Sequence, residues 1–186
     1  MTTKSRSDGF TLIDMLVTVS LFTVLAAMAL PTMTDVTGAL TLSSATREVE
    51  REMQTARLKA VTSNRPMRVR FNCPTSGEFR MVELIGTASV PDAADNANDR
   101  CSDTKYPFPA ADTNPLTRPN NDGALRRLNS KLAFGTVSTL EFWPDGTVHL
   151  AGVATPLGGT GTSITVKKGT TIRTITVNGL GKVQIQ

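Results

Sequence analysis

The feature that most constrains this chain is a run of 20 residues, 15–34, that contains no charged side chain. At about 1.5 Å of rise per residue, a helix of that length spans the roughly 30 Å hydrocarbon core of a bilayer. The preceding residues 1–9 are polar and carry Lys4 and Arg6. Because positive charge marks the cytoplasmic side of a membrane helix, the pattern predicts one span with a cytoplasmic N-terminus and a translocated remainder.

An ordinary cleaved signal peptide is the alternative interpretation of this segment. Such a peptide ends at a small-x-small site directly before a polar mature start. Here the sequence Ala-Met-Ala-Leu-Pro runs on into residues that are compatible with helix. We therefore favour a hydrophobic helix that stays attached to the chain.

An acid, Asp14, directly precedes this run and follows the apolar residues Leu12 and Ile13. Placing a carboxylate in a membrane helix costs up to about 3 kcal/mol at mid-membrane depth and less near an interface. Such a residue is therefore expected to have a binding partner or a functional role. One explanation is a helix N-terminal acid, which the helix macrodipole favours. The other is a charge pair with a group outside this segment.

Residues 9–31 resemble the N-terminal signal of type IV pilins and type II secretion pseudopilins. The shared features are a short basic leader, Gly9, Phe10, an acid at Asp14 and a proline at Pro31. The resemblance implies that a prepilin peptidase removes residues 1–9 by cutting between Gly9 and Phe10, and that the new Phe10 amine is methylated. It also implies that Asp14, in place of the family's usual glutamate, pairs with the N-terminal amine of a neighbouring subunit.

Beyond a hydrophobic helix at residues 10–34, the apolar residues recur at steps of three and four, which predicts an amphipathic helix over residues 35–65. Pro66 disfavours helix at the residue before it and should end this helix. The charged face is expected to carry Arg47, Glu48, Glu50, Arg51 and Glu52. The apolar stripe is expected to consist of Leu42, Ala45, Val49, Met53, Ala56 and Ala60.

From residue 67 onward the apolar period changes to two, which predicts strands. We expect them at residues 67–71, 79–85, 138–143, 147–153, 163–168, 170–178 and 182–185. The fold class is therefore α+β: a long hydrophobic N-terminal helix packed on a C-terminal antiparallel sheet or sandwich. That domain, residues 66–186, should contain an exposed loop at about 86–123, where Asp, Asn, Ala and Pro dominate.

The two cysteines, Cys73 and Cys101, are too far apart for a Cys-x-x-Cys redox or zinc motif. In a translocated domain they are expected to form one disulfide, with two buried free thiols as the alternative. His149 is the only histidine and should be a half-exposed strand residue. Because the chain also lacks a nucleophile elbow and a phosphate-binding loop, we predict no enzymatic activity, no metal and no cofactor.

The sequences Leu-Glu-Phe-Trp-Pro-Asp-Gly-Thr at 140–147 and Val-Asn-Gly-Leu-Gly-Lys-Val at 177–183 resemble the GspH/FimT branch of the pseudopilins. The resemblance implies a minor pilin or pseudopilin that helps assemble a type IV pilus or a type II secretion pseudopilus. Its partners would be other pilins, the inner-membrane assembly platform and the prepilin peptidase. The chain would be a single-pass protein of the bacterial inner membrane with a periplasmic domain, later assembled into a filament.

A DNA-binding minor pilin, active in DNA uptake, is the alternative function. Some members of the FimT side bind DNA through a C-terminal Gly-Arg-x-Arg motif, and this chain has Gly-Lys-Val-Gln there, with Lys182 as its only cation. Lys167, Lys168 and Arg173 on the neighbouring predicted hairpin would add phosphate contacts. The net charge of +4 would suit an acidic partner such as nucleic acid, but an excess this small is more often that of a solvated surface.

Overall fold

The structure, a computed structural model, describes residues 10–86, 92–109 and 118–186, without the side chains at 29–32, 34 and 35. The expected leader 1–9, the side chain of Pro31, and residues 87–91 and 110–117 of the expected loop lie outside the described residues. The chain divides into two compact units, Met1–Leu40 and Thr41–Gln186.

Helix α1, Leu12–Ser63, joins the two expected helical segments into one helix that continues through residues 34 and 35. In the first unit every described side chain from 10 to 28 is exposed, and the large apolar ones are between 53% and 84% exposed. Among the residues that the structure describes, no helix is both long enough and apolar enough to cross a membrane.

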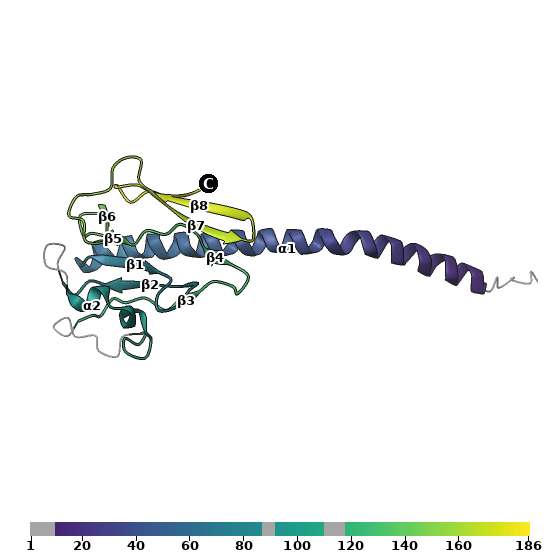
Figure 1. Ribbon diagram of the computed structural model, residues 1–186, viewed down its shortest axis with the longest axis horizontal. Helices are drawn as coiled ribbons and strands as arrows, with labels where there is room; N and C mark the ends of the chain where they lie inside the picture. The colour runs from purple at the N-terminus through teal and green to yellow at the C-terminus, as the bar shows by residue number, and fades with distance from the viewer. Residues whose placement is uncertain (1–9, 87–91, 110–117) are drawn as a thin grey trace, which may run out of the picture. The chain divides into compact units, whose positions relative to one another are not determined.

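The second unit contains the C-terminal part of α1 and two antiparallel sheets (Figure 1). The first sheet has the strand order β3-β2-β1-β5-β6. Its strands are β1 Met67–Phe71, β2 Glu78–Glu83, β3 Arg126–Arg127, β5 Leu140–Phe142 and β6 Val148–Leu150. The chain is therefore an α+β protein.

The second sheet has the strand order β4-β7-β8-β9. Its strands are β4 Ala133–Phe134, β7 Thr162–Lys168, β8 Thr171–Val177 and β9 Val183–Ile185. All seven strands expected from the period of two are present. Strands β3 and β4 were not predicted, because two residues are too few to show an alternation.

The apolar stripe of α1 forms one hydrophobic core with both sheets. Its six predicted residues are all buried, and all belong to this core. The same core contains three phenylalanines of the sheets, Phe71, Phe79 and Phe134, which pack against one another with ring centroids 5.1 to 6.3 Å apart. The periodicity in the sequence thus predicted the packing face of the helix.

One residue of the expected charged face, Glu52, is instead buried, so that assignment was wrong. The Glu52 carboxylate lies 3.6 Å from Arg126 of β3, and its Oε1 would be in close contact with any side chain at Gly123. Burial raises the pKa of the Glu52 carboxyl, and the nearby Arg126 and Lys59 offset this only partly.

The segment expected to be an exposed loop is not exposed throughout. It contains the short helices α2, Ala93–Asn96, and η1, Asn98–Cys101, and it buries Asp95, Arg100 and Asp122. These residues cover one edge of the first sheet and its outer face, which is the face turned away from the hydrophobic core. Charged side chains lie on that face because side chains alternate between the two faces along a strand. A polar composition predicted exposure, whereas the structure pairs the charges and buries them.

We predict that Glu52→Gln raises the melting temperature near neutral pH by roughly 2 to 4 °C. The raised pKa means that burial penalises the charged carboxylate, and this penalty is present only above the ordinary value of 4.5. Thermal unfolding followed by circular dichroism should therefore show a gain that disappears at about pH 4. Glu50→Gln in the same helix is the matched control, because Glu50 does not contribute to the raised pKa of Glu52, and an equal gain in both variants would contradict the assignment.

Candidate functional site

The N-terminal end of α1 is built by a reciprocal cap between Thr11 and Asp14. The Asp14 amide donates to Thr11 Oγ1 at 3.3 Å, while Asp14 Oδ2 accepts from the Thr11 amide at 3.2 Å and from its hydroxyl at 2.7 Å. This is a capping box, which satisfies amides that lack partners in the first turn. Sequence reasoning singled out Asp14 and missed Thr11, although the Thr-x-x-Asp spacing is the visible signal of such a cap.

The capped end carries the apolar residues with the greatest exposure. Phe10, the residue after the expected cleavage point, is 84% exposed, and Leu12 is 80% exposed. Gly9, the other residue of that point, lies outside the described part of the chain. An apolar surface of this extent, with one acid at its edge, is typical of a segment that other molecules cover.

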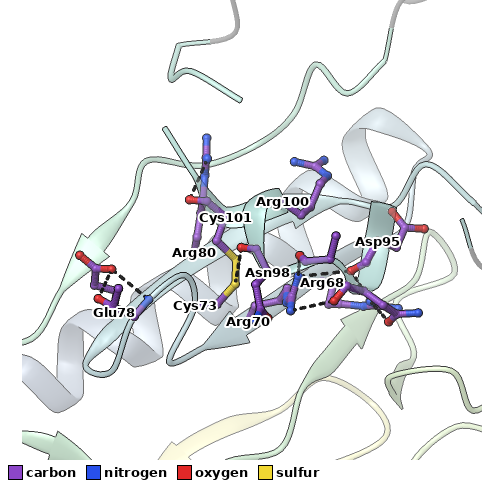
Figure 2. The surroundings of a disulfide bond; sticks show 12 residues. Arg68, Arg70, Cys73, Glu78, Arg80, Asp95, Asn98, Arg100 and Cys101 are labelled. Carbon is purple, nitrogen blue, oxygen red and sulfur yellow. Dashed lines mark hydrogen bonds between the residues drawn. A yellow bond between two sulfur atoms is a disulfide. The ribbon is translucent and has the colours of Figure 1, made fainter. Parts of the chain in front are cut away.

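A disulfide joins Cys73, in the turn between β1 and β2, to Cys101 at the end of η1 (Figure 2). The two Cα atoms are 5.7 Å apart, which is ordinary disulfide geometry. The bond therefore ties the segment that contains α2 and η1 to the first sheet. In a chain-entropy description, a loop of this length contributes roughly 3 to 4 kcal/mol.

Buried arginines hold the same segment on the sheet. Arg68 donates to Glu141 Oε1 at 2.7 Å and to the Asp95 carbonyl oxygen at 2.8 Å. Arg80 donates to the carbonyl oxygens of Gly123 and Tyr106, each at 2.7 Å. Figure 2 shows Arg68 and Arg80 around the disulfide.

A second charge pair, Arg100–Asp122, holds the segment against the edge of β2. Both side chains are buried, and the Arg100 guanidinium also lies 4.3 Å from the Tyr106 ring centroid. Asp122 Oδ1 accepts from the Glu83 amide at 2.8 Å, so the pair is anchored in the sheet. Buried pairs of this kind fix geometry more than they add stability.

His149 is 2% exposed, so the expectation of a half-exposed residue was wrong. Its Nε2 lies 2.8 Å from Thr147 Oγ1, its Nδ1 lies 3.1 Å from the Val153 carbonyl oxygen, and its ring stacks on Trp143. Both ring nitrogens are therefore engaged in structural contacts. Within the described residues, no group of three or more His, Cys, Asp or Glu side chains could hold a metal ion.

The two C-terminal motifs have local structural roles. Trp143 and Thr147 close the expected tight turn, in which Gly146 has a φ of +84°. Gly181 has a φ of +73°, its carbonyl oxygen accepts from Arg57 Nη1 at 3.3 Å, and a Cβ there would overlap the Arg57 side chain. The terminal motif thus joins the last strand to α1, a contact with Arg57 that the sequence did not indicate.

The four cations proposed to contact DNA do not form one cluster. Lys167, Lys168 and Arg173 lie around the β7–β8 turn, where Lys167 pairs with Ile172 and Arg173 with the buried Val166. Lys167 and Arg173 therefore lie on opposite faces of the sheet. Lys182 is bonded through its backbone to Asn178 at the other end of β8, about 20 Å away at 3.3 Å per residue. DNA binding stays a prediction.

Comparison with known families gives two matches. The model of the type II transport protein GspH matches residues 45–181, and that of the prokaryotic N-terminal methylation motif matches residues 4–30. No curated protein matches the chain significantly.

Two solved structures resemble the chain. The minor pseudopilin EpsH from the type 2 secretion system of Vibrio cholerae aligns at 12% identity with a TM-score of 0.44, over 78% of this chain and 95% of that one. The type IV minor pilin FimU of Pseudomonas aeruginosa aligns at 15% identity with a TM-score of 0.45, over 78% and 92%.

Proposed function

The chain belongs to the family of the type II transport protein GspH, and we propose that it is a pilin-like structural subunit of a secretion pseudopilus or a type IV pilus. The methylation motif at its N-terminus supports a membrane-anchored precursor that is cut between Gly9 and Phe10. In this proposal the chain acts by assembling with other subunits and has no catalytic residue. Its partners are other pilins, the inner-membrane assembly platform and the prepilin peptidase.

The observation that carries the proposal is the exposed apolar helix at residues 10–28. Leaving such a surface in water is unfavourable by roughly 25 cal/mol per Å². A lipid bilayer covers it before assembly, and the equivalent helices of other subunits cover it afterwards. The precursor would then be a single-pass inner-membrane protein with a cytoplasmic N-terminus and a periplasmic second unit.

Asp14 gives this assembly its specificity. Cleavage before Phe10 creates a positive amine four residues from an acid in the same apolar surface. Both Thr11 bonds go to Asp14 Oδ2, and Oδ1 accepts no hydrogen bond from a described residue. The carboxylate can therefore keep its cap and still accept from the Phe10 amine of a neighbouring subunit, which neutralises both charges in apolar surroundings.

Processing is tested by intact-mass analysis of the chain extracted from membranes. We expect residues 1–9 to be missing and one methyl group to be added at Phe10. A chain that still begins at Met1 or Thr2 in cells with an active prepilin peptidase would contradict the proposal.

The charge pair is tested by comparing Asp14→Asn with Thr11→Val, each scored by co-purification with partner pilins. Asp14→Asn removes the charge, so incorporation should fall at least tenfold, the order expected when one partner of a buried pair is lost. Thr11→Val removes the capping hydroxyl but keeps the carboxylate, so incorporation should stay near wild type. Asp14→Glu should also be tolerated.

Two outcomes would contradict the charge pair. Wild-type incorporation of Asp14→Asn would show that the charge is dispensable. An equal loss in Thr11→Val and Asp14→Asn would show that Asp14 acts by capping the helix. Membrane insertion and cleavage of each variant serve as controls, because both should be unchanged.

A further inference from the structure

A cavity of about 450 Å³ lies in the second unit. It is bordered by the residues that follow α1, the residues that follow β2, and the β5–β6 turn. Its apolar wall consists of Pro66, Leu84, Trp143 and Pro144. All the described residues that line it belong to this one unit. Its volume falls within the range of roughly 300 to 1,000 Å³ that is usual for ligand sites. The cavity can therefore hold a large side chain and part of its backbone.

The aromatic wall of this cavity is held rigidly. The Trp143 indole stacks on His149 with ring centroids 4.1 Å apart and planes 13° apart. His149 cannot easily turn, because both of its ring nitrogens are engaged and its side chain is buried. A fixed aromatic surface binds an apolar group at a low cost in side-chain entropy.

The charge of the lining is one-sided. Among the described residues it contains two arginines, Arg65 and Arg118, and no acid. Arg118 is already paired, since its Nε donates to Glu83 Oε1 at 2.6 Å. No described residue makes an ion pair or hydrogen bond with the Arg65 side chain, so Arg65 supplies unbalanced positive charge beside an apolar wall.

We propose that this cavity binds a segment of a partner protein that presents an aromatic side chain next to a carboxylate. The aromatic group would pack against Trp143 and Leu84, and the carboxylate would pair with Arg65, whose guanidinium suits bidentate recognition. The choice of a protein segment over a free metabolite rests on the proposed function, in which this unit meets other subunits.

The test uses the intrinsic fluorescence of the full-length chain in a nonionic detergent, because Trp143 is its only tryptophan. The probe is acetyl-Ala-Phe-Asp-Ala-amide, and its matched control carries Asn in place of Asp. We expect a saturable change with the Asp peptide and about tenfold weaker binding of the Asn peptide, the usual effect of losing a charge-assisted bond.

Arg65→Gln should lower the affinity for the Asp peptide about tenfold and leave the Asn peptide unchanged. Arg51→Gln is the control, because it removes an exposed arginine of α1 that does not line this cavity. Equal affinities for the two peptides, or equal effects of the two variants, would overturn the recognition of a carboxylate.

Two further outcomes would overturn the proposal. The absence of any saturable change would show that the cavity takes no peptide. Binding of 3-phenylpropionate as tightly as the Asp peptide would identify a small-molecule site. Either result leaves the assembly role intact, because that role depends on Asp14 and the first unit.

Discussion

The structure of the second unit depends on the packing of one helix face against two sheets. Val49, Met53 and Ala56 are fully buried, and they share a core with strands from both sheets. Because α1 occupies the inner faces, the charged outer face of the first sheet needs another cover. The segment around Cys101 supplies that cover through a disulfide and buried arginine pairs, and the cavity forms where the helix ends.

The same helix has opposite surroundings in the two units. Between Leu42 and Ala60 its apolar stripe is covered by the chain's own sheets, whereas from residue 10 to 28 the described side chains have no such cover. The second unit therefore buries the packing stripe of the helix in its own core, whereas the apolar side chains at 10–28 of the first unit have no core of their own to enter. This difference makes the first unit the part of the chain that other subunits would cover during assembly.

The sequence predicted those features that depend on local periodicity. The stripe from Leu42 to Ala60 and the longer strands follow from spacing alone, because a helix or strand repeats its buried face regularly. Glu52 was misplaced because its charge suggested solvent, while its contact with Arg126 comes from a distant strand too short to predict. Likewise, the pairing of Arg68 with Glu141 joins residues 73 positions apart, so no local pattern contains it.

Site-specific photo-crosslinking from Val17, an exposed residue of the first unit, tests whether other subunits cover this helix in cells that assemble the filament. Gln54, exposed in the second unit, provides the comparison. We expect Val17 to crosslink to the N-terminal helix of another pilin-like subunit only when assembly proceeds. Adducts to lipid alone under assembling conditions, with no subunit captured, would contradict it.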